Sequence, residues 1–295
     1  MDGEHKVTLA IYSGVPDPVW SVHSRHDSFK RMKEHLHNVR TTGKIYRRQH
    51  MPAILGYKGF LVQPPEAEEA ELVVGQETKE LQKLLLETMP EGLISEALRL
   101  KILQAIESTN VPHPSNVPLE AQKASLQEVS KAPRKEYKAE KIQHYAPKLN
   151  LDRWNNRPFI EANNNCYNYA NDKITNSFAQ PGRASGHPYG ALTPEELLKA
   201  SESDGLVKMN VGPDDPCPEA PEQPNCLVAL FVAQGIDYHW YRLDDNKLWS
   251  HKPGRTAATK YDGDGKSISD PRKAAMSGID YKFVSFMKIF TNIIE

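Results

Sequence analysis

The stretch between residues 109 and 150 constrains the fold of this chain more than any other feature. It is rich in lysine and glutamate, poor in apolar residues, and interrupted by Pro112, Pro114, Pro118, Pro133 and Pro147. Structureless segments of about 40 residues are uncommon inside one compact domain. The sequence therefore predicts two units, at residues 1–108 and 151–295. They are joined by a linker or surface strap over 109–150, with one short helix near 118–130.

Length and charge exclude several classes of protein. A chain of 295 residues suits one to two domains, each able to enclose its own core. The formal net charge of −1 gives no electrostatic reason to expect nucleic acid or a membrane as partner. No apolar run approaches the ~20 residues of a membrane span, and residues 1–6 lack the apolar core of a signal peptide. We expect a cytoplasmic protein of unknown oligomeric state, with secretion by another route left open.

Residues 1–108 predict a small α/β unit. Strand-forming residues fill 7–12 and again 55–62, where turn residues bound each run. Apolar residues recur at helical spacing over 27–40. They do so twice over 76–107, where a proline and a glycine separate the two patterns. None of the glycine-containing turns has the spacing of a phosphate-binding or dinucleotide-binding loop.

Residues 151–295 predict an antiparallel sheet with helices packed on it. A helix should begin at Thr193 and Pro194, because threonine is a favoured N-cap and proline a favoured first helical residue. Strand patterns then follow at residues 227–233, 238–243, 247–251 and 281–290. The Asp-Asp-Asn turn between the second and third of these predicts a hairpin. The fold class expected for the whole chain is α+β.

One cysteine stands where a polar loop should turn into a helix. Residues 163–170 read Asn-Asn-Asn-Cys-Tyr-Asn-Tyr-Ala, and we expect the helix to run over 167–174. A helix N-terminus and a neighbouring imidazole both favour the thiolate form of a cysteine. His239 lies 73 residues after Cys166, on an expected strand. The sequence therefore predicts a nucleophile paired with a base.

The order of cysteine, strand histidine and a polar residue on the next strand resembles that of papain-like cysteine hydrolases, in particular the NlpC-type peptidases. The resemblance covers residues 151–295. It implies that Cys166 is the nucleophile, that His239 is the general base and then acid, and that His251, 12 residues later, orients His239. It also implies a peptide or another amide-containing substrate, with no cofactor and no metal ion. Peptidase, amidase and acyl-transfer activities share this chemistry, and the sequence does not separate them.

Four further residues are candidates for substrate contacts. The second oxyanion donor, beside the Cys166 backbone N–H, is expected to be Asn156 or Asn163. Gln180 would touch substrate from the next loop, and Trp240 would form a wall of the cleft.

Two alternatives remain open at this point. One is a non-catalytic binding or structural module that uses the aromatic and turn-rich loops of the second unit. The other is a zinc site, because Cys166, His239 and His251 are ligand types that zinc accepts. Cys217 and Cys226 bracket a proline-rich loop, and they are either two free thiols or a disulfide.

Overall fold

A computed structural model describes residues 3–108, 112–114, 146–212, 214–219, 226–276, 278–290 and 292–295. Most of the expected linker, residues 115–145, lies outside the described residues, as does the short helix expected near 118–130. These expectations stay predictions. Across the described ranges, none of the helices combines the length and the apolar character needed to cross a lipid bilayer.

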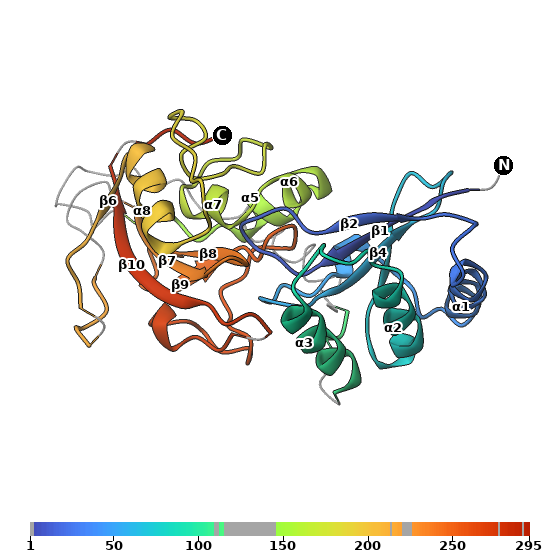
Figure 1. Cartoon of the computed structure of the whole chain (residues 1–295). Helices are drawn as coiled ribbons and strands as arrows, with labels where there is room; N and C mark the ends of the chain where they lie inside the picture. Colours follow the sequence, from blue (N-terminus) through green and yellow to red (C-terminus); the bar gives the residue numbers. More distant parts are fainter. Residues whose placement is uncertain are drawn as a thin grey trace, which may run out of the picture.

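The first unit is a five-stranded sheet with helices beside it (Figure 1). Its strands, in the order β2-β1-β4-β5-β3, pair antiparallel throughout, so the unit is α+β and not a parallel α/β arrangement. Its elements are β1 (His5–Ala10), β2 (Val19–Val22), α1 (Phe29–Thr41), β3 (Tyr46–Arg47), η1 (Arg48–His50), β4 (Gly59–Gln63), β5 (Glu71–Val73), η2 (Gln76–Thr78), α2 (Lys79–Glu87) and α3 (Glu96–Glu107).

The predicted helices of the first unit are confirmed, and its strands only in part. Helix α1 buries Met32, Leu36 and Val39, which recur every three or four residues along one face. Strand β4 begins at Gly59, four residues later than the pattern indicated. The short strands β3 and β5 were not predicted, because runs of two and three residues are too short to show an alternating pattern.

The second unit also contains a five-stranded antiparallel sheet, in the order β6-β10-β7-β8-β9. The mixed helix and antiparallel content confirms the α+β class. The elements are α5 (Leu151–Asn155), α6 (Pro158–Asn163), α7 (Cys166–Ala170), α8 (Pro194–Ser203), β6 (Leu206–Lys208), β7 (Cys226–Ala233), β8 (Asp237–Leu243), β9 (Trp249–His251), η3 (Pro271–Lys273) and β10 (Lys282–Ile289).

The sequence predicted this second sheet well. Helix α8 has Thr193 as its N-cap and Pro194 as its first residue, as expected. Four of the five strands were expected. The hairpin predicted between residues 238–243 and 247–251 is confirmed by the antiparallel pairing of β8 with β9. Only β6, a three-residue strand, was not predicted.

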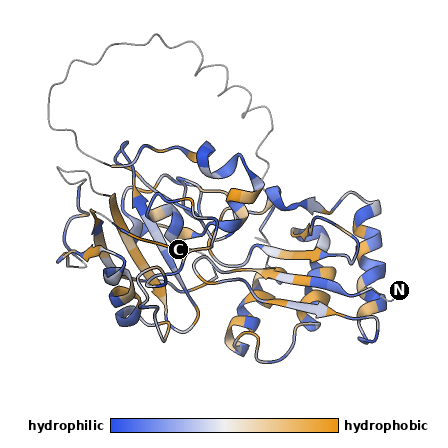
Figure 2. Cartoon of the chain, turned by 90° about the horizontal axis from the view of Figure 1, so that it is seen from above, coloured by the Kyte–Doolittle hydropathy of each residue, from blue (hydrophilic) through white to orange (hydrophobic). Residues whose placement is uncertain are grey.

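Strand β7 is buried on both faces, which explains its almost unbroken apolar sequence. Val228, Leu230 and Val232 pack with α7 and α8 on one face. Residues of the opposite face, including Phe231 and Ala233, belong to a cluster that continues into the first unit. In Figure 2 the strands of both units carry much of the hydrophobic colour, whereas outer loops are mainly hydrophilic.

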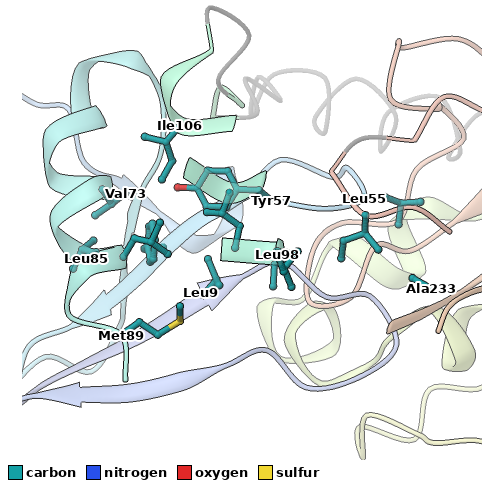
Figure 3. Packing of buried hydrophobic residues seen from close by; sticks show 14 of the residues in the cluster. Leu9, Leu55, Tyr57, Val73, Leu85, Met89, Leu98, Ile106 and Ala233 are labelled. Atoms are coloured by element: carbon teal, nitrogen blue, oxygen red, sulfur yellow. The ribbon is translucent and has the colours of Figure 1, made fainter. Parts of the chain in front are cut away.

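The two units therefore share one apolar core. Figure 3 shows this cluster, in which Leu55 of the first unit lies on the side toward Ala233 of the second. Leu9, Leu85 and Ile106 form its part between the first sheet and helices α2 and α3. The division at 109–150 thus separates two sheets along the chain without separating two independent cores.

Candidate functional site

Helix α7 begins at Cys166 and is held at its start by a side-chain cap. The Asn165 side-chain oxygen accepts from the backbone N–H groups of Tyr167 and Asn168, at 3.0 and 3.1 Å. The Asn168 side chain accepts in return from the Asn165 backbone, which completes a capping box. The predicted change from loop to helix at Cys166 is confirmed, but the helix ends at Ala170, four residues earlier than expected.

A buried lysine holds the loop before Cys166 through hydrogen bonds to its backbone carbonyl oxygens. The Lys252 ammonium, which follows strand β9, donates to the backbone carbonyl oxygens of Glu161, Asn164 and Gly254, each at 2.7 Å. Three carbonyl acceptors satisfy all three N–H bonds of an ammonium group. This contact ties the start of α7 to the strand that carries His251.

Cys166 lies against the main chain of β8, at a stretch that β9 does not reach. Its Sγ is 3.9 Å from the carbonyl oxygen of Tyr238, and its side chain is fully buried. Burial raises the pKa of the thiol to about 12, and the nearby Asp237 carboxylate raises it further. In this closed structure Cys166 is therefore a protonated thiol, and the expectation of a depressed pKa is wrong.

The two histidines meet as predicted. His251 lies directly opposite Tyr241 in the β8–β9 pair, so His239 is its diagonal neighbour on the same face. His239 Nε2 is 2.8 Å from His251 Nδ1, and His251 Nε2 is 3.0 Å from the carbonyl oxygen of Tyr261. Burial lowers the pKa of His239 well below its usual value and that of His251 to about 4, so both rings are neutral near pH 7.

The partners of these rings determine where each proton lies. The Tyr261 carbonyl can only accept, so His251 carries its proton on Nε2 and leaves Nδ1 bare. Bare Nδ1 must then accept from His239 Nε2–H, which leaves His239 Nδ1 with a free lone pair. The result is a directed relay that leaves His239 Nδ1 unprotonated, which is the form in which an imidazole can accept a proton.

Ser13, from the first unit, hydrogen-bonds to His239 Nδ1. Its hydroxyl is 2.6 Å from His239 Nδ1 and donates to it, and its influence on the nearby Cys166 thiol lowers the pKa of that thiol, against the larger effect of burial. Ser13 therefore takes the His239 nitrogen that the expected Cys166–His239 pair would use, while the Cys166 thiol lies against the Tyr238 carbonyl. Residues 13–18 show only a turn between two strands in the sequence, and no local signal marks Ser13 as part of a site.

Residues 12–15, Tyr-Ser-Gly-Val, form the segment that closes the site, and we call them the inserted segment. They lie in the β1–β2 connection, which reaches the second unit in Figure 1. The carboxylate of Asp237 accepts from the backbone N–H groups of Ser13, Gly14 and Val15, at 2.6, 3.0 and 3.0 Å. Burial raises the pKa of Asp237 to about 6, although these N–H groups and the Tyr281 hydroxyl act in the opposite direction.

The carbonyl of Gly14 is held as firmly as the amides. Its oxygen accepts from Asn165 Nδ2 at 3.0 Å and from Gln180 Nε2 at 2.9 Å. Gln180 was predicted to touch substrate, and in this structure it contacts the inserted segment. The Lys58 ammonium donates to the carbonyl of Tyr12 at 3.1 Å, so the segment is bonded from both units.

The other three predicted contact residues lie elsewhere. Trp240 is fully buried and packs its ring at 5.5 Å from that of Tyr167, so it does not line an open cleft. Asn163 donates its amide to the carbonyl of Phe159, within its own helix. Asn156 is exposed and borders a hollow of about 640 Å³ that includes Arg157 but none of the cysteine or histidine site.

A second hollow of about 270 Å³ is lined by Cys217 and Trp249, again apart from Cys166. Cys166, Cys217 and Cys226 are all free, so the two-thiol alternative holds in this structure. Over the ranges that the structure covers, no group of three or more histidine, cysteine or acidic side chains is arranged to hold a metal ion.

Comparison with known proteins adds one relative. The chain is 48% identical over 123 residues to insoluble matrix shell protein 1 of Ruditapes philippinarum, a match that spans 42% of this chain and 77% of that protein. No protein-family model matches the chain. No solved structure matches it either.

Proposed function

The chain belongs to the family of insoluble matrix shell protein 1, and from this premise we propose that its second unit is a papain-like, NlpC-type cysteine hydrolase or acyltransferase. The inserted segment holds its site closed. One observation carries the proposal: the relay through His251 and His239 ends in an unprotonated His239 nitrogen, and the Ser13 hydroxyl donates to it. A nucleophile, a base and a group that orients the base are the parts that such acyl-transfer sites share.

The reaction begins when the inserted segment withdraws. The Cys166 thiol gives its proton to His239 Nδ1, and its sulfur attacks the carbonyl carbon of an amide. The carbon–nitrogen bond breaks, the amine leaves with the proton that His239 received, and a thioester remains on Cys166. Water or an acceptor amine then releases the acyl group and restores the thiol. His251 keeps the His239 ring oriented throughout, because its Nδ1 accepts a hydrogen bond from His239 Nε2–H.

Withdrawal of the segment also changes the chemistry of the thiol. In the closed structure burial is the main reason that the pKa of Cys166 is raised. Access of water removes that cause, and the neighbouring His239 can then favour the thiolate as an imidazolium–thiolate pair. The inactive and active states differ, in this proposal, by the position of four residues.

Gly14→Val in the full chain tests the proposal by forcing the segment out. A Cβ on Gly14 would lie 2.4 Å from the ring of Tyr238, which is buried and cannot move aside freely. With p-nitrophenyl acetate as acyl donor, we expect an acetyl adduct on Cys166, read by intact mass and peptide mapping. The adduct should be lost when His239→Ala is added.

Gly190→Val is the matched control, because a Cβ on Gly190 meets nothing within 4 Å. It should leave Cys166 as unreactive as in the natural chain. The proposal fails if folded Gly14→Val acetylates Cys166 no faster than Cys217 and Cys226. It also fails if the adduct maps to Ser13.

The closed geometry favours a second function, a non-catalytic structural component of an extracellular matrix. Insoluble matrix shell protein 1 is, by its name, an insoluble protein of shell matrix, and the fully buried Cys166 supports a similar role for this chain. Amide hydrogen exchange separates the two functions. If the amides of residues 13–15 exchange only through global unfolding, the site stays shut in the native protein and the structural role is favoured.

A further inference from the structure

We infer that the inserted segment occupies the peptide-binding groove of the second unit as a substrate would, and that the substrate is a peptide with glycine in the place of Gly14. This inference rests on the proposed function and names the substrate class of the same site. It combines three features: main-chain recognition, exclusion of a side chain at one position, and the approach of the preceding residue to the reacting groups.

Main-chain groups make the principal contacts of the segment with the second unit. Asp237 receives three successive backbone N–H groups, and the amides of Asn165 and Gln180 hold the oxygen of the Gly14 carbonyl. These groups occur in every peptide except where proline removes an N–H. A peptide from another molecule can therefore make the same bonds once the segment has left.

The position of Gly14 admits no side chain. Its Cβ would lie 2.4 to 2.5 Å from three atoms of the Tyr238 ring. That ring is held in place, because the Tyr238 hydroxyl donates to Gln180 Oε1 at 3.1 Å and the Tyr189 ring packs edge-on at 6.2 Å. Since Gln180 also binds the Gly14 carbonyl, one side chain both fixes the wall and recognises the peptide.

Ser13, the residue before this glycine, approaches the proposed general base His239. The Ser13 hydroxyl donates to His239 Nδ1 at 2.6 Å, and Ser13 is fully buried. The Ser13 hydroxyl occupies His239 Nδ1, the nitrogen that would accept the proton of the Cys166 thiol. This explains why the chain's own segment stays bound without reacting. A glycine-containing peptide is thus delivered to the nucleophile, and the native segment acts as its unreactive analogue.

Two synthetic peptides test the inference on the full chain carrying Gly14→Val. The first is acetyl-Tyr-Ser-Gly-Val-amide, and the matched control is acetyl-Tyr-Ser-Ala-Val-amide. The measurement is the rate at which iodoacetamide labels Cys166. At about ten times its Kd the glycine peptide should slow labelling about ten-fold, because only the free site reacts. The alanine peptide should leave the rate unchanged, and neither should affect Cys217 or Cys226.

Equal protection by both peptides, or protection by neither while Cys166 is labelled, would overturn the inference. Ser13→Phe displaces the same segment by a different clash and replaces Gly14→Val should that variant not fold. If Cys166 stays unlabelled in both folded variants, residues 12–15 do not close the site and the inference is wrong.

The result is separable from that of the acetylation experiment. Glycine-selective protection without an acetyl thioester would leave a peptide-binding groove and reject the hydrolase. A thioester on Cys166 without selectivity between the two peptides would keep the hydrolase and reject glycine as the determinant.

Discussion

The two sheets have the same number of strands and the same antiparallel pairing, but they bury very different side chains. The first packs mainly leucine, isoleucine, valine and aromatic residues against helices α2 and α3. The second also buries charged and hydrogen-bonding groups, among them Asp237, His239, Arg242, Asp244 and Lys252. Such groups contribute little net stability even when paired, and losing one partner costs several kcal/mol. Their concentration in one unit marks where the chain maintains specific polar geometry.

The contrast is sharpest between two arginine–carboxylate pairs. Arg242 is 1% exposed and donates to Asp244 at 2.8 and 2.9 Å, while Arg40 makes a similar forked contact with Glu71 on the surface of the first unit. We expect Arg242→Ala to lower the free energy of unfolding by about 3–5 kcal/mol, because it strands a buried carboxylate. Arg40→Ala should cost about 0–1 kcal/mol. Equal losses in urea unfolding would remove the contrast between the units.

Titration of His251 should make the free energy of unfolding depend on pH. Its pKa is lowered from 6.5 to about 4 by burial. Between these values the unfolded chain binds a proton that the native chain does not, so stability is lost as the pH falls through this window. Compared with His251→Gln, the natural chain should lose about 1.4 kcal/mol per pH unit from pH 6.5 to 4. Chemical unfolding at several pH values measures this, and a constant difference would contradict it.

Helix caps give the smallest contrast. Ser95 caps α3 of the first unit through one bond to the Leu98 N–H, and Ser95→Ala should cost about 1 kcal/mol. Asn165 caps α7 but also donates to the carbonyls of Gly14 and Ala179. Asn165→Ala should therefore cost about 1–3 kcal/mol more, because those buried partners lose a donor. Thermal unfolding of the two variants tests the order, and a smaller loss for Asn165→Ala would show that the inserted segment is not held through this side chain.

Much of the second unit was predictable because its signals are local. Thr193 and Pro194 start α8 through their own backbone preferences, and the turn after β8 sets the register that brings His251 beside His239. Burial of β7 on both faces follows from its unbroken apolar run. Each of these inferences needs only residues within about a dozen positions of one another.

The state of Cys166 was not predictable in the same way. The residues around it indicated a helix start, which is present, and from it a depressed pKa, which is not. Burial outweighs the short helix, and burial depends on what covers the cysteine. Cys166 is buried in the apolar cluster of the second unit, and Ser13 and Gly14, more than 150 positions earlier in the sequence, bond to His239 and Asn165 beside it from a turn that carries no local signal of these contacts.

By itself, then, the amino-acid sequence determined which segments become strands and helices and that two histidines share one hairpin face, since hydrophobic period, caps and turns act over short distances. Docking of the first unit decided that a serine hydroxyl bonds to the His239 imidazole, and burial in the folded chain decided that the thiol is neutral. Those outcomes depend on desolvation and on contacts between residues 226 positions apart, which no local pattern encodes.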